Sequence, residues 1–100
     1  MLTKYNLYIG LNDKDSKQQE IFTLDAYKIV GALVGDCTIQ EARGLYTHRD
    51  GTKVLEATLI VQVIDFDNTL DIIPVVNSLK TALNQESIAV IREQVDSKLI

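Results

Sequence analysis

The sequence predicts one small α+β domain in which a four-stranded, mainly antiparallel sheet carries two helices on one face. Three observations lead to this prediction. The chain of 100 residues fits a single domain, 1–100, with a core of its own. Stretches with a two-residue hydrophobic period alternate along the chain with stretches at helical spacing. The dipeptide Asp50-Gly51 stands between two strand-like stretches and is typical of a tight β-hairpin turn.

The N-terminal part of the chain predicts a strand, a loop and a helix. Apolar residues alternate with others over residues 4–11, which predicts the first strand. The polar stretch 12–20 predicts a loop. A helix is expected over about 24–34, with Thr23 as its N-cap and Gly35 in the position of a C-cap glycine.

The middle of the chain predicts two strands, 37–47 and 54–66, joined by a hairpin. If Asp50 and Gly51 form a two-residue turn, Arg49 faces Thr52 and the register of the whole pair follows. Apolar or small pairs would then face the helices: Tyr46 with Leu55, Gly44 with Ala57, and Ala42 with Leu59. The other sheet face, left open by the helices, would carry Leu45 with Glu56, Arg43 with Thr58, and Glu41 with Ile60.

The C-terminal part predicts a second helix and a last strand. Asp71 is the expected N-cap, and Pro74 falls in the first turn, where its missing N–H costs little. Apolar residues from Ile72 to Leu83 recur at helical spacing, and 87–95 predicts the last strand. The order β-α-β-β-α-β with right-handed crossovers predicts a ferredoxin-like two-layer sandwich, strand order 4-1-3-2.

Composition narrows the classes of function. A net charge of −4 argues against binding to nucleic acid or to an anionic membrane surface. Cys37 is the only cysteine and His48 the only histidine, so we expect no disulfide and no metal site. No glycine-rich phosphate-binding loop follows the first strand, and we expect no cofactor. No basic-apolar leader and no apolar run near the ~20 residues of a membrane span are evident, so the cytoplasm is the expected location.

Residues 38–65 resemble the central hairpin of a family of small bacterial proteins of unknown function. In that family a glycine and an aromatic residue precede a turn and a glutamate follows it, as Gly44, Tyr46 and Glu56 do here. A glutamine-serine element before its last strand is similar to Gln85-Glu86-Ser87. The resemblance implies a ferredoxin-like fold, no established activity, and four candidate binding residues: Tyr46, Glu56, Gln85 and Ser87. The alternative is that Gln85 and Ser87 only cap the second helix.

These observations favour a non-enzymatic binding or assembly module. The protein would form a homo-oligomer, a dimer, or bind a protein partner through its open sheet face or an edge strand, since apolar groups on an uncovered sheet commonly mark an interface. The candidate interface residues are Tyr8, Glu41, Arg43, Leu45, Thr58 and Ile60. One alternative is a small-molecule sensor or weak enzyme using Glu56 with Gln85 or Tyr46. Another is an inhibitor of a second protein, encoded on a mobile element.

Overall fold

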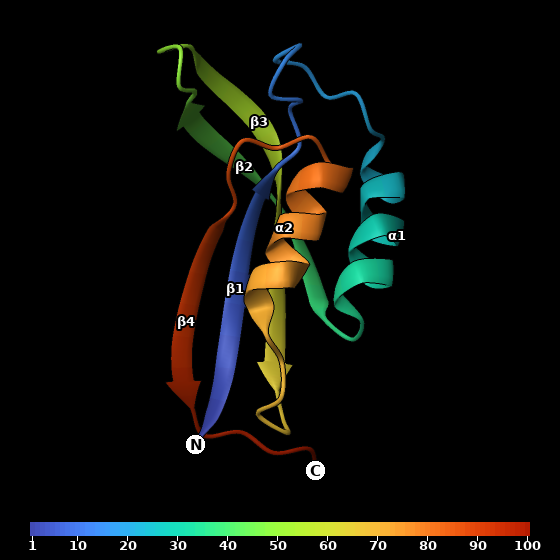
Figure 1. Ribbon diagram of the computed structural model, residues 1–100, viewed down its shortest axis with the longest axis vertical. Coiled ribbons are helices and arrows are strands. Elements are labelled where there is room, and N and C mark those ends of the chain that lie inside the picture. Colours follow the sequence, from blue (N-terminus) through green and yellow to red (C-terminus); the bar gives the residue numbers. More distant parts are fainter.

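The computed structural model describes residues 1–100 and has the predicted order of elements (Figure 1). The strands are β1 (Leu2–Gly10), β2 (Thr38–Thr47), β3 (Lys53–Asp65) and β4 (Ala89–Val95), and the helices are α1 (Thr23–Val34) and α2 (Ile72–Ala82). All strand pairs are antiparallel, in the order β2-β3-β1-β4. This is the predicted order 4-1-3-2 counted from the opposite edge, so the predicted α+β sandwich is confirmed.

Both helices pack on one face of the sheet, over a core of thirteen buried apolar side chains. The central strands supply most of this core because Leu7 of β1 lies opposite Val61 of β3 and both side chains are fully buried. Ala26 and Val30 of α1 and Leu79 of α2 are equally shielded. Burying a side chain such as Leu or Val contributes about 1.5–3 kcal/mol, so this layer is the main stabilising element of the domain.

The helix ends match the prediction in part. Asp71 caps α2 as expected, since its Oδ1 accepts the backbone N–H of Ile73 at 3.3 Å. Gly35 follows α1 with φ of 86°, a conformation that side-chain-bearing residues rarely adopt. Thr23 was expected to cap α1, but it is already helical. Phe22 stands at the cap position without a side-chain hydrogen bond, so that prediction is wrong.

The β2–β3 hairpin differs from the prediction by one residue of register. Its loop has three residues, because the N–H of His48 donates to the carbonyl of Thr52 at 2.8 Å and the N–H of Gly51 donates to the carbonyl of His48 at 2.9 Å. Gly51 has φ of 87° and Asp50 does not have a positive φ. This combination is a type I turn followed by a left-handed glycine, and the two-residue turn that was predicted would need positive φ at both residues.

The slip exchanges the two faces of β2, since side chains alternate between sheet faces. Three predicted open-face residues therefore lie on the helix side of the sheet: Glu41, Arg43 and Leu45, opposite Leu59, Ala57 and Leu55. Glu41 lies close to Tyr27 of α1, whose phenol pKa is raised by burial and, to a lesser extent, by this carboxylate. The open face instead carries Ala42, Gly44 and Tyr46, together with Tyr8, Glu56, Thr58 and Ile60.

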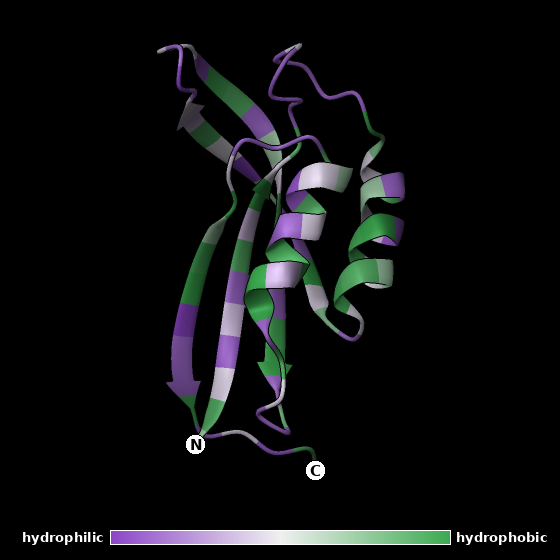
Figure 2. Cartoon of the chain, viewed as in Figure 1, coloured by the Kyte–Doolittle hydropathy of each residue, from purple (hydrophilic) through white to green (hydrophobic).

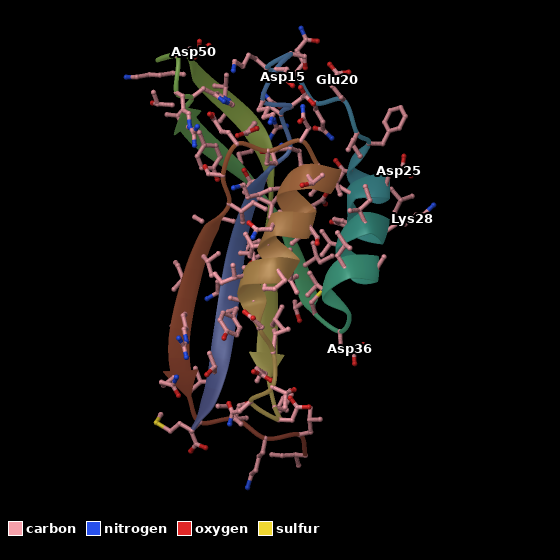
Figure 3. The ribbon with its side chains drawn as sticks, viewed as in Figure 1. Asp15, Glu20, Asp25, Lys28, Asp36 and Asp50 are labelled. Carbon is pink, nitrogen blue, oxygen red and sulfur yellow. The ribbon has the colours of Figure 1, made fainter.

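Three connections gather at one end of the molecule, the upper end in Figure 1, and both chain termini lie at the other. They are the loop between β1 and α1, the hairpin turn and the α2–β4 connection; in Figure 2 they are mostly hydrophilic. Figure 3 labels Asp15 and Asp50 at this end. Lys17 Nζ lies 3.7 Å from Asp50 Oδ2, and Asn84 Nδ2 donates to Asp13 Oδ1 at 2.7 Å, so side chains tie the connections together. Neither helix is long and apolar enough to cross a membrane.

Candidate functional site

A pocket of about 170 Å³ lies on the open sheet face, at the end where the hairpin meets the α2–β4 connection. Its wall is assembled from segments far apart in the sequence. β1 contributes Tyr8 and Gly10, the hairpin contributes Tyr46, Thr47, His48 and Glu56, and the last connection and β4 contribute Gln85, Glu86, Ser87 and Ala89. No lysine or arginine is among these residues.

The four binding candidates taken from the sequence, Tyr46, Glu56, Gln85 and Ser87, all line this pocket. Of the six interface candidates, only Tyr8 does so. The register of β2, β3 and β1 places the strand residues of the pocket side by side. Glu56 of β3 lies opposite Gly44 of β2, and Thr58 of β3 lies opposite Gly10 of β1.

Glu56 is the most perturbed group of the pocket. Its side chain is buried, with 5% of the residue exposed, and its Oε2 accepts the backbone N–H of Asn12 at 2.6 Å. Burial raises the pKa of this carboxyl above its ordinary value, and the charge of Glu86 adds to the rise. The hydrogen bond from Asn12 opposes it, as does the nearby His48 when its ring is protonated. Its Oε1 makes no hydrogen bond with the protein, so the group can take a proton or face a positive charge.

Two glycines make room for the pocket side chains. A Cβ on Gly10 would lie 2.6 Å from Cδ of Glu56, and a Cβ on Gly44 would lie 2.5 Å from the hydroxyl oxygen of Tyr46. The Glu56 carboxylate and the Tyr46 ring can therefore lie close against the sheet backbone. The phenol oxygen of Tyr46 comes within 3.4 Å of Thr58 Oγ1, which fixes the ring at its outer end.

His48 and Glu86 join the hairpin to the α2–β4 connection. Nδ1 of His48 lies 2.6 Å from Oε1 of Glu86, and 7% of His48 is exposed. Arg49 approaches the other oxygen of Glu86 at 3.7 Å from the solvent side, and its own side chain is 86% exposed. Glu86 is thus partly neutralised, whereas Glu56 has no lysine or arginine partner.

Gln85 has the structural role that the alternative interpretation predicted for it. Its amide nitrogen donates to the carbonyl of Leu83, at the end of α2, at 3.2 Å and to that of Asn12 at 2.8 Å. Gln85 therefore holds the first loop against the helix end. Ser87 makes no side-chain hydrogen bond and is exposed at the pocket edge.

Sequence reasoning missed several residues of this pocket, above all His48 and Glu86. Glu86 stands between two residues that were singled out, and His48 is the only histidine of the chain. Both facts were available signals, but their contact joins positions 38 residues apart and depends on the hairpin register. No group of three or more His, Cys, Asp or Glu side chains is placed to hold a metal ion.

Two solved structures share the fold of this chain. One is a phage SAM lyase in complex with S-methyl-5'-thioadenosine, with a TM-score of 0.78 and 22% sequence identity over 93% of this chain and 81% of that chain. The other is a phage SAM lyase in the apo state, with a TM-score of 0.70 and 23% identity over 91% and 78% of the two chains. No protein-family model and no curated protein sequence matches.

This likeness overturns the functional prediction made from the sequence. The fold was expected to belong to a non-enzymatic binding or assembly module, but the solved structures that share it are of an enzyme. The non-enzymatic module and the inhibitor of a second protein are therefore wrong. The sequence placed the alternative of a weak enzyme on Glu56 with Gln85 or Tyr46, and these three residues line one pocket although they come from distant segments. The resemblance to a small bacterial family stays a prediction.

Proposed function

We propose that this protein is a lyase that cleaves S-adenosylmethionine in the pocket around Glu56, with S-methyl-5'-thioadenosine as one product. The charge of the pocket carries this proposal: two carboxylates and two phenols line it, without lysine or arginine. S-adenosylmethionine has a sulfonium and an ammonium against a single carboxylate, so it is a cation. The fold likeness to a phage SAM lyase supports the same substrate.

The product identifies the bond that breaks. S-methyl-5'-thioadenosine keeps the methyl and adenosyl groups on sulfur, so the cleaved bond joins sulfur to the four-carbon amino-acid chain. Both electrons of that bond go to sulfur, which becomes a neutral thioether. A lyase adds no water, so the carbon that leaves sulfur forms its new bond within the four-carbon fragment. It forms either a double bond to the neighbouring carbon, which loses a proton, or a single bond to an oxygen of the fragment's own carboxylate.

Glu56 suits a role in either course of this reaction. Its Oε2 is fixed by the N–H of Asn12, and its free Oε1 can accept a proton or face the cationic substrate. Burial weakens the competition from water, which strengthens the attraction between the carboxylate and a positive charge. Tyr8 and Tyr46 also line the pocket, and aromatic rings attract cations that lie over their faces.

The pocket encloses only part of such a substrate. Its volume of about 170 Å³ is below the roughly 300–1,000 Å³ of typical ligand sites, so the remainder would lie across the open sheet face. The homo-oligomer expected from the sequence stays part of the proposal, because a second copy of the chain over this face would add a wall to the site. The cytoplasm stays the expected location.

The test is to incubate the purified protein with S-adenosylmethionine and to measure S-methyl-5'-thioadenosine by chromatography. We expect product from the wild type and a loss of at least about a hundredfold in Glu56→Gln, as is usual when an acid–base group is removed. Glu41→Gln is the matched control, because Glu41 lies on the helix side of the sheet. A folded wild type that forms no product, or an equal loss in both variants, would contradict the proposal.

A further inference from the structure

His48 is a pocket residue with a buried polar atom that has no partner. Its Nδ1 faces Glu86 Oε1 at 2.6 Å, but its Nε2 is shielded from solvent and has no hydrogen-bond partner in the protein. The residue is nevertheless held firmly, since its backbone N–H and carbonyl bond to Thr52 and Gly51 across the turn. A buried polar atom without a partner lowers stability, so it calls for a specific explanation.

The partner of Nδ1 determines what Nε2 can do. A carboxylate such as that of Glu86 only accepts hydrogen bonds, so Nδ1 carries the proton of the imidazole. In the neutral ring Nε2 is then a bare acceptor. Two polar side chains that line the same pocket are bonded elsewhere: Gln85 donates to two backbone carbonyls, and Oε2 of Glu56 accepts from Asn12.

We infer that Nε2 of His48 is a hydrogen-bond acceptor for the ligand of this pocket, and that it receives a hydroxyl or amino hydrogen of a bound nucleoside. S-methyl-5'-thioadenosine offers both kinds of donor, in its ribose hydroxyls and its adenine amino group. That the ligand is a nucleoside rests on the proposed function. Glu86 is, on this inference, a positioning residue that fixes the tautomer and the orientation of the ring.

Two variants separate ligand binding from a purely structural role. In His48→Gln the side-chain amide reaches the place of Nε2, so the contact with the ligand is kept and the contact with Glu86 is lost. In His48→Asn the amide reaches only the place of Nδ1, so the contact with Glu86 is kept and the contact with the ligand is lost. We expect titration with S-methyl-5'-thioadenosine to show affinity retained within about threefold in His48→Gln and weakened about tenfold in His48→Asn. The opposite order of affinities would mean that His48 only holds Glu86 and would overturn the inference.

Nitrogen-15 NMR gives a second, direct measurement on the wild type. His48 is the only histidine, so the imidazole signals need no assignment. We expect a protonated Nδ1 and a bare Nε2 in the free protein, and a shift confined to Nε2 when S-methyl-5'-thioadenosine is added.

The outcomes of this measurement separate the inference from the proposed function. Proton NMR of the same sample reports on the rings of Tyr8 and Tyr46. If the nucleoside shifts these ring signals and leaves Nε2 unchanged, the inference is wrong and the proposed function stands. A buried water molecule on Nε2 in both states would give this same result. If the nucleoside leaves all pocket signals unchanged, the proposed function fails and the inference fails with it.

Discussion

A single methyl group at Gly10 should displace the central carboxylate of the pocket. A Cβ at this position would lie 2.6 Å from Cδ of Glu56, closer than Cβ atoms approach other atoms in proteins, and a tight 3.0 Å from its Oε2. Glu56 cannot simply retreat, because its Oε2 is bonded to the N–H of Asn12 at 2.6 Å. Gly10→Ala therefore tests whether the glycine is present to make room for Glu56.

The expected cost follows from the two ways in which the chain can respond. Overpacking without rearrangement costs about 1–3 kcal/mol. If Glu56 instead swings away, the charged hydrogen bond to Asn12 is lost, which costs about 1.5–3 kcal/mol. Either response lowers the free energy of unfolding by about 2 kcal/mol, and the melting temperature should fall by roughly 10 °C.

Urea unfolding of matched variants measures this cost. Gly31→Ala is the control, because a Cβ on Gly31 of α1 meets no atom within 4 Å and alanine in a helix gains up to about 1 kcal/mol over glycine. In the Glu56→Ala background the clash is absent, so Gly10→Ala should cost much less there. An undiminished cost in that background, or a Gly10→Ala protein as stable as the wild type, would mean that Gly10 is not needed to make room for Glu56.

Two further predictions concern the core and the response to pH. Leu79→Ala removes a fully buried side chain between α2 and the sheet and should lower the free energy of unfolding by about 2–5 kcal/mol in urea; a loss below 1 kcal/mol would contradict the packing described. The raised pKa of Glu56 gives a stabilising contribution that is present below the ordinary value of 4.5 and is lost as pH rises through the folded-state value. The free energy of unfolding of Glu56→Gln, relative to that of the wild type, should therefore rise from pH 4 to pH 7. Urea unfolding of both proteins across this range measures the difference. A difference that does not change with pH would mean that burial does not disfavour the charged carboxylate.

Most of the fold could be predicted from the sequence because its signals are local. Hydrophobic periods of two and of 3.6 residues located all six elements, and Asp71 marked the start of α2. The hairpin was correctly located, but its register was not. Asp50-Gly51 fits a two-residue turn and also the end of a three-residue turn. The choice depends on the φ of Asp50, which the residue types do not determine.

The pocket was less predictable than the fold. Its four candidates came from a resemblance to other sequences, and the sheet then brings them together because β4 pairs with β1 and β1 with β3. The contact of His48 with Glu86 has no local signal, since it exists only when the hairpin turn reaches the α2–β4 connection. Glu41, Arg43 and Leu45 were misplaced by the register alone.

The three-residue hairpin turn has a consequence for related sequences. Loops usually tolerate a change of length, because they seldom determine which side chains a domain presents. Here the loss of one residue from the turn would shift β2 against β3 and reverse its faces. Tyr46 would leave the pocket and Leu45 would enter it, with no substitution in either strand. Among relatives of this protein, a one-residue gap at the turn should therefore mark a change of ligand.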